Sequence, residues 1–169
     1  VVSGTVTLAT ATAATTAGGT ATFATLSLTG LVGSYTLRFS APSVSSVDAS
    51  SPTVLSAGPA KQLSLTTQPA SNALAGAALA PQPVVQLRDT SGNTASGAGV
   101  VVTASLIGGT ATLANTTATT NAAGLATFTG LAITGLSGSY ALRFSAASLT
   151  PVDATAATVL GAGAAAQLV

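Results

Sequence analysis

Few side chains in this sequence are capable of acid–base or metal chemistry. The 169 residues include three acidic and four basic side chains, and they contain no His and no Cys. General acid–base catalysis draws on His, Glu, Asp, Lys, Tyr or Cys held close together, yet the acidic residues are all Asp and lie far apart in the chain, at Asp48, Asp89 and Asp153. The sequence therefore predicts a protein that is not an enzyme and has no cofactor, disulfide or zinc site.

Asp89 and Asn93 are polar side chains close together in the sequence that could act as ligands. They enclose Thr-Ser-Gly directly after an alternating apolar segment, a composition that favours a hairpin turn capped by Asp89. Oxygen ligation of calcium is the alternative, but calcium takes six to eight oxygens and usually several carboxylates. Lys61 raises a second alternative, an isopeptide crosslink to Asn, which would need a neighbouring acidic group to move protons. We therefore interpret Asp89 and Asn93 as turn residues without a metal.

The chain contains an internal repeat. Residues 1–64 align with residues 106–169 without a gap, and 37 of the 64 aligned positions are identical. The resulting period of 105 residues is the size of an independent small domain. We therefore predict an incomplete first copy at residues 1–58, a complete copy at 59–163, and the start of a next copy at 164–169.

Three residues recur in both copies and are predicted to be structural. Each Gly-Ser-Tyr segment enters an alternating strand, which is typical of the tyrosine corner of a sandwich fold. The recurring Arg and Asp are ten residues apart in each copy, a spacing that predicts an ion pair across neighbouring strands, with a contact between modules as the alternative. The recurring pairs are Tyr35 and Tyr140, Arg38 and Arg143, and Asp48 and Asp153.

Short alternating strands separated by Gly, Asn and Ser turns predict an all-β fold, an immunoglobulin-like β-sandwich. In the segment 82–89 we expect Val85 and Leu87 to point inward, and Gln86 and Arg88 outward. Residues 71–80 are rich in Ala, but the glycine and the neighbouring strands favour a loop or an edge segment over a helix.

The segments VQLRDTSGN, with Asp89 and Asn93, and GLATF, with Phe128, carry a specific resemblance. They are similar to the bacterial immunoglobulin-like repeats of large secreted and surface proteins. The resemblance implies tandem modules in an extracellular, cell-surface setting and implies no catalytic residues. It favours structural material of a filament, stalk, sheath or surface layer, with an adhesin module that binds a glycan through its loops as the alternative.

The expected partners are further copies of the same repeat. A net charge of +1 with scattered basic residues argues against binding to nucleic acid. The sequence contains no run of about 18 apolar residues, the length that would predict a membrane span. The incomplete first copy should leave an apolar face open, covered either by a longer array or by strands of another chain. This face is expected to include Phe23, Leu28, Tyr35, Leu37 and Phe39.

Overall fold

The computed structural model describes residues 1–2 and 4–163, and the predicted start of a next copy at 164–169 lies outside the described residues. The described residues form strands and turns without a helix, which confirms the predicted all-β class. In this part of the chain there is accordingly no helix with the length and hydrophobicity needed to cross a membrane. The chain divides into two compact units, unit 1 at Val1–Ala57 and unit 2 from Gly58 onward.

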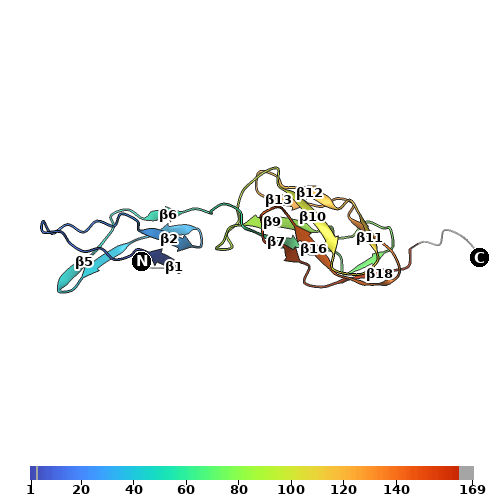
Figure 1. Cartoon of the computed structure of the whole chain (residues 1–169), viewed down its shortest axis with the longest axis horizontal. Coiled ribbons are helices and arrows are strands. Elements are labelled where there is room, and N and C mark those ends of the chain that lie inside the picture. The colour runs from blue at the N-terminus through green and yellow to red at the C-terminus, as the bar shows by residue number, and fades with distance from the viewer. Residues whose placement is uncertain (3, 164–169) are drawn as a thin grey trace, which may run out of the picture. The chain divides into compact units, whose positions relative to one another are not determined.

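Unit 2 is built from short strands that assemble into several small sheets (Figure 1). One sheet has the order β12-β10-β16-β17, a second has the order β13-β9-β7, a third has the order β15-β18-β8, and β11 pairs with β14. The strands are β7 (Gln62–Thr67), β8 (Asn72–Leu74), β9 (Val84–Arg88), β10 (Val101–Leu106), β11 (Thr112–Ala114), β12 (Thr117–Thr119), β13 (Leu125–Thr127), β14 (Ala132–Thr134), β15 (Gly138–Tyr140), β16 (Leu142–Ser145), β17 (Val152–Asp153) and β18 (Thr158–Gly161).

The core of unit 2 follows from alternation along these strands. Successive side chains of a strand point to opposite faces, so β10 buries Val102 and Ala104 and exposes Val101, Thr103 and Ser105. β16 likewise buries Leu142 and Phe144 and exposes Arg143. Side chains from β7, β9, β10, β13, β16 and β18 meet in one buried apolar cluster. The cluster includes the Phe128 and Phe144 rings, whose centroids lie 5.3 Å apart.

The prediction for β9 was wrong at Gln86, which is only 5% exposed rather than solvent-facing. β9 lies between β13 and β7, and turns cover the face that alternation had assigned to solvent. The Gln86 amide nitrogen donates among four carbonyl oxygens, those of Leu87, Ala95, Ala123 and Gly124, at 3.0–3.3 Å. A buried amide is tolerated when it is hydrogen-bonded in this way.

The segment 71–80 contains β8, a short strand at the end of its sheet. β8 runs parallel to β18, with Asn72 opposite Val159 and Leu74 opposite Gly161. The edge position predicted for this segment is therefore confirmed.

Unit 1 repeats part of this arrangement with fewer strands. Its strands form three separate pairs, β1 with β2, β3 with β6, and β4 with β5. In sequence these pairs correspond to β11 with β14, β15 with β18, and β16 with β17 of unit 2. The unit 1 strands are β1 (Val6–Ala9), β2 (Ser27–Gly30), β3 (Gly33–Tyr35), β4 (Arg38–Ala41), β5 (Val44–Asp48) and β6 (Thr53–Leu55).

Candidate functional site

Asp89 closes a turn directly after β9. One carboxylate oxygen, Oδ1, accepts the backbone N–H groups of Ser91 and Asn93, each at 2.9 Å. The other, Oδ2, accepts the Asn93 side-chain amide and the backbone N–H of Gly58, also at 2.9 Å. Gly92 takes a φ of 85°, a left-handed conformation that glycine adopts without steric cost. Asp89 and Asn93 thus lie where the sequence placed them, in a turn, and Asp89 also binds the first residue of unit 2.

Hydrogen bonding keeps Asp89 ionised. The Asn93 side-chain amide lowers the pKa of this carboxyl most, the Gly58 N–H lowers it further, and burial opposes both. Bonds to the charged form favour that form. Four N–H donors therefore surround a carboxylate that is 6% exposed. The described residues contain no group of three or more His, Cys, Asp and Glu side chains suited to a metal ion.

Neither the contact of Gly58 with Asp89 nor the role of Gln86 was predicted from the sequence. Gly58 contributes a backbone N–H, which the residue type does not reveal. It lies 31 residues from Asp89 in the sequence, and only the fold brings the two together. Gln86 lies beside Gly124, whose φ is +75° and where an added Cβ would overlap the Ala95 carbonyl oxygen. The glycine therefore allows the two turns over β9 to approach each other, and the Gln86 amide joins them.

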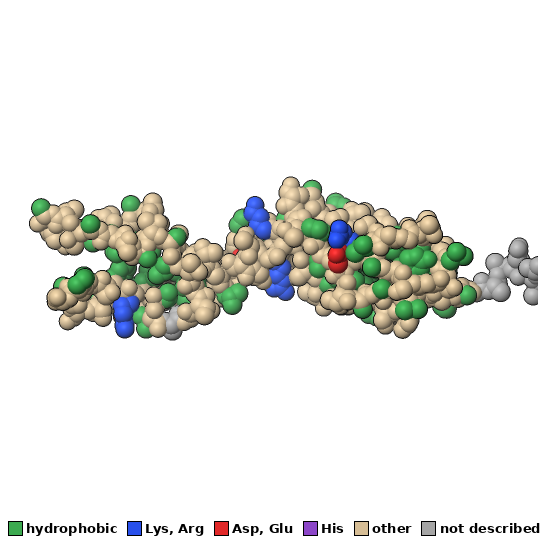
Figure 2. Space-filling model, turned by 60° about the horizontal axis from the view of Figure 1, so that its bottom comes forward, with side chains coloured by type: hydrophobic (Ala, Val, Ile, Leu, Met, Phe, Trp, Pro, Cys, Tyr) green, Lys and Arg blue, Asp and Glu red, His purple; other side chains and the backbone are tan. Residues whose placement is uncertain are grey.

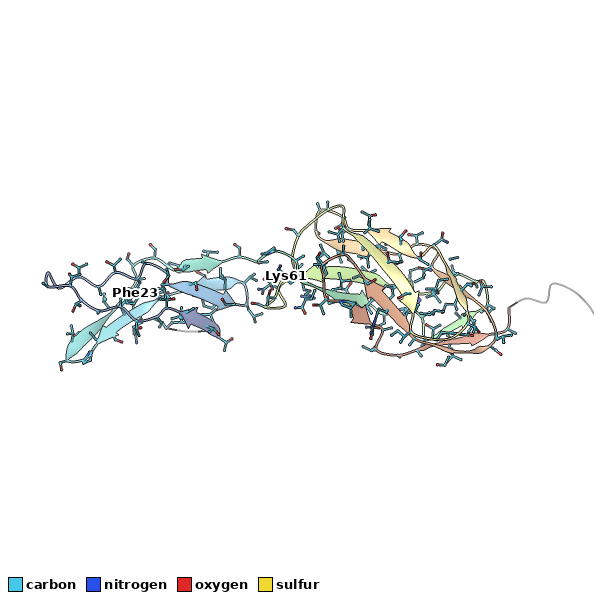
Figure 3. The ribbon with its side chains drawn as sticks, in the orientation of Figure 1. Phe23 and Lys61 are labelled. Atoms are coloured by element: carbon cyan, nitrogen blue, oxygen red, sulfur yellow. The ribbon has the colours of Figure 1, made fainter. Side chains whose placement is uncertain are left out.

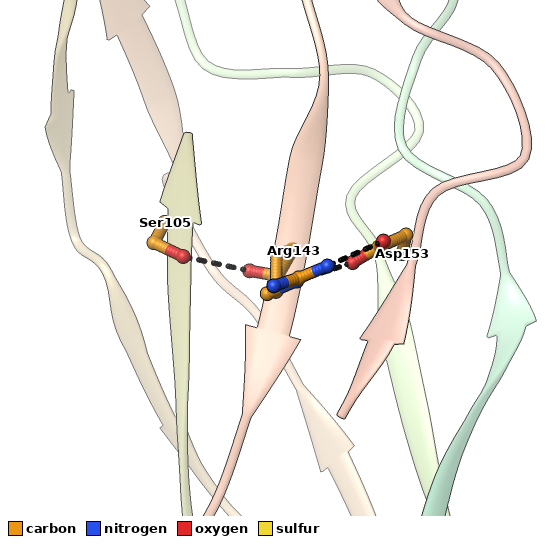
Figure 4. Close-up of polar contacts among 3 residues, drawn as sticks. All are labelled: Ser105, Arg143 and Asp153. Carbon is orange, nitrogen blue, oxygen red and sulfur yellow. Dashed lines mark hydrogen bonds and ion pairs between the residues drawn. The ribbon is translucent and has the colours of Figure 1, made fainter. Parts of the chain in front are cut away.

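The predicted Arg–Asp pairs lie on neighbouring antiparallel strands. Arg38 on β4 is opposite Asp48 on β5, and Arg143 on β16 is opposite Asp153 on β17. In each pair Nε donates to Oδ1 at 2.6 Å and Nη2 donates to Oδ2 at 2.8 Å. Figure 4 shows the unit 2 pair, with the Ser105 hydroxyl donating to the Arg143 carbonyl oxygen on the other side.

Both ion pairs are about half exposed to solvent. In each pair the hydrogen bond from the guanidinium lowers the pKa of the Asp carboxyl. Exposed ion pairs contribute little to stability because water and salt screen them. Their bidentate geometry instead aligns two neighbouring strands. Figure 2 shows few other charged side chains on the face that it presents.

Each tyrosine forms a corner within its own unit. The Tyr35 hydroxyl donates to the Leu31 carbonyl oxygen and the Tyr140 hydroxyl donates to that of Leu136, both at 2.8 Å. Tyr35 is 8% exposed and Tyr140 is 9% exposed. The expectation that Tyr35 belongs to an exposed apolar face was therefore wrong, because its ring lies against Gly4 and Gly33 within unit 1.

Unit 1 has an open apolar groove. Its volume is about 230 Å³, and Phe23, labelled in Figure 3, and Phe39 form its aromatic lining, with ring centroids 5.3 Å apart. Both rings are only partly buried, and β5 is exposed along its whole length. We call this surface the open face; it is lined by Ala13, Thr15, Ala21, Phe23, Phe39, Ser40, Ala41, Val44, Ser45 and Val47.

Comparison with known proteins identifies a family for this chain. A family model described as SMCHD1 Ig-like domain 6 matches residues 58–158. The match lies within unit 2 and covers more than half of the chain. No curated protein matches the chain. Together with the sheets and core described above, this match makes unit 2 an immunoglobulin-like β-sandwich.

Proposed function

This chain belongs to the family of SMCHD1 Ig-like domain 6, and we propose that it is a structural module of an extracellular bacterial filament, stalk, sheath or surface layer. The extracellular bacterial setting rests on the resemblance of VQLRDTSGN and GLATF to surface repeats. The structural role rests on the hydrogen-bond partners of the acidic side chains. All three carboxylates, Asp48, Asp89 and Asp153, bind partners within their own units and hold strands or turns in place.

The observation that carries the proposal is the parallel pairing of β8 with β18. β8 lies near the beginning of unit 2 and β18 near its end. Pulling the two ends of the unit apart draws parallel neighbours in opposite directions along their axes. The hydrogen bonds between them are then loaded together in shear, rather than one after another as in a peeled hairpin.

Several bonds contribute to this junction. The ladder between β8 and β18 extends over three residue pairs. It is extended by a buried bond from the Thr158 hydroxyl to the Ala70 carbonyl oxygen at 2.7 Å. Backbone bonds flank it, Val159 N–H to the Ser71 carbonyl at 2.8 Å and Ala75 N–H to the Gly161 carbonyl at 3.1 Å.

A second parallel contact acts on β7. Gln62 forms an isolated parallel bridge with Thr150. Leu63 N–H donates to the Thr150 carbonyl at 3.0 Å, and Thr150 N–H donates to the Lys61 carbonyl at 2.9 Å. Two consecutive strands at the beginning of unit 2 are therefore tied in parallel to its C-terminal part, which suits a load-bearing module.

Single-molecule pulling of the full chain by its two ends tests this role. The two units are distinguished by the contour length of the unfolded chain, about 37 nm for residues 58–163 of unit 2 and about 20 nm for unit 1, at about 3.5 Å per extended residue. Val159→Pro removes the N–H that donates to Ser71 and should lower the peak force of the longer event. Val54→Pro is the matched control, because Val54 aligns with Val159 and β6 pairs only with β3 in the described part of unit 1.

An unchanged peak force in Val159→Pro would show that the β8–β18 junction does not bear load. The alternative function, an adhesin that binds a glycan, is tested by a glycan array with the full chain. Selective glycan binding that persists in Val159→Pro would favour the adhesin over the structural module.

A further inference from the structure

The open face of unit 1 corresponds to an interior surface of unit 2. The strand pairs of unit 1 recur in unit 2 with the same register: Leu8 opposite Leu28 becomes Leu113 opposite Ile133, and Gly33 opposite Leu55 becomes Gly138 opposite Leu160. Even a connecting bond recurs, since Val2 N–H donates to the Thr36 carbonyl at 2.9 Å and Ile107 N–H to the Ala141 carbonyl at 2.8 Å. Unit 1 is therefore folded as the second half of the sandwich.

The strands that flank these pairs in unit 2 have no counterpart in unit 1. β16 pairs with β10 as well as β17, whereas β4 belongs to a two-stranded sheet with β5. β18 pairs with β8 as well as β15, whereas β6 pairs with β3 in a two-stranded sheet. The edges of β4 and β6 that face these positions are open among the described residues. An edge of this kind is a template for a further strand.

The same positions differ in burial between the two units. Phe128 and Phe144 are 1% and 0% exposed, whereas the aligned Phe23 and Phe39 are only partly buried. Ala126 is fully buried, whereas the aligned Ala21 is exposed. In unit 2 the cover comes from the segment 59–105: Ala104 on β10 pairs opposite Phe144, and Val85 on β9 pairs opposite Ala126. The complete copy thus shows which strands fit over the open face.

We propose that the open face of unit 1 binds a segment equivalent to residues 59–105, supplied by another copy of the repeat. The inference rests on the proposed structural function and adds the means of assembly. The bound segment adds a β10-like strand beside β4 and a β8-like strand beside β6. Its inward residues, equivalent to Val85, Leu87 and Val102, cover Phe23 and Phe39.

The donor is an additional segment rather than one exchanged between two identical chains. Residues 1–169 contain two acceptor surfaces, one in unit 1 and one in unit 2, and one segment 59–105. Exchange of this segment between two chains would bury one surface and open another, with no net gain. Closing unit 1 therefore requires a further copy of the segment, and every such closure joins one repeat to the next.

A small ligand suits the open face less well. Its volume of about 230 Å³ is below the roughly 300–1,000 Å³ of most small-molecule sites. Its lining consists of Ala, Thr, Ser, Val and Phe without a charged side chain. Backbone edges beside an apolar surface instead suit the addition of strands.

The test adds a second copy of residues 58–105 ahead of Val1, so that Ser105 leads into Val1 as it leads into Leu106 in the complete copy. The control carries Val85→Asp, Leu87→Asp and Val102→Asp in the added copy alone. Hydrogen exchange of unit 1 and binding of an apolar dye are measured in both proteins and in the original chain. Unit 2 provides an internal reference, because its own segment is unchanged.

We expect the added copy to slow amide exchange over residues 37–41 by at least about tenfold and to abolish dye binding at unit 1. The Asp control should leave both as in the original chain. The proposal is overturned when the added segment exchanges freely and unit 1 is unchanged, or when the Asp control protects unit 1 equally well. Either result leaves the force measurement on unit 2 unaffected, so failure of this inference is distinguishable from failure of the structural role.

Discussion

Matched phenylalanines offer a direct measure of how the two units differ. Phe128 is 1% exposed, and truncating a fully buried Phe to Ala costs about 3–5 kcal/mol. Phe23 occupies the aligned position on the open face and is only partly buried. Partial burial leaves less apolar area to lose, so Phe23→Ala should cost about 1–2 kcal/mol. The two substitutions are chemically identical, which leaves burial as the difference between them.

The assay uses the single tyrosine of each unit. With fluorotyrosine incorporated, the ¹⁹F resonances of Tyr35 and Tyr140 report unfolding of units 1 and 2 separately during a guanidinium titration. Tyr35→Phe assigns the two signals. The free energy of unfolding follows from the midpoint and slope of each transition. Costs for Phe128→Ala and Phe23→Ala that agree within about 0.5 kcal/mol would contradict the open face, because they would require equal burial of the two rings.

Two further outcomes follow from the polar contacts. Tyr140→Phe removes the hydroxyl bond to the Leu136 carbonyl and should destabilise unit 2 by about 1 kcal/mol, with no change in unit 1. Because this substitution removes the tyrosine of unit 2, its effect is read from amide hydrogen exchange of the buried strands of unit 2. The pKa values of the carboxyls of Asp48, Asp89 and Asp153 are lowered by folding, so the unfolded chain binds protons more readily and the stabilisation is lost as the pH falls below about 4. The melting temperature should therefore be nearly independent of pH between about pH 5 and 9 and should fall at lower pH. A melting temperature that stays constant down to about pH 2 would contradict these contacts. Asp89→Asn should reduce the fall in the melting temperature of unit 2 in acid.

Local sequence patterns predicted much of the fold correctly. Alternation places Val102 and Ala104 on one face of β10 and Leu142 and Phe144 on one face of β16, and all four residues are buried. Period-two patterning works here because each of these strands has one covered face and one solvent face. The same reasoning failed at Gln86 because both faces of β9 are covered. Alternation along one strand does not show whether turns from elsewhere in the chain cover its second face.

The sequence by itself determined the all-β class, the repeat, and the residue types that exclude thiol and histidine chemistry, since these depend only on composition and on neighbours along the chain. Tertiary structure alone decided the partners that lie far apart in sequence. It brought the Gly58 N–H to Asp89, placed β8 parallel to β18, and left Phe23 partly exposed where Phe128 is buried. The physical reason is that burial and strand pairing depend on which segments occupy the opposite layer. Aligned segments therefore acquire different environments, because that layer is present in unit 2 and is not found among the described residues of unit 1.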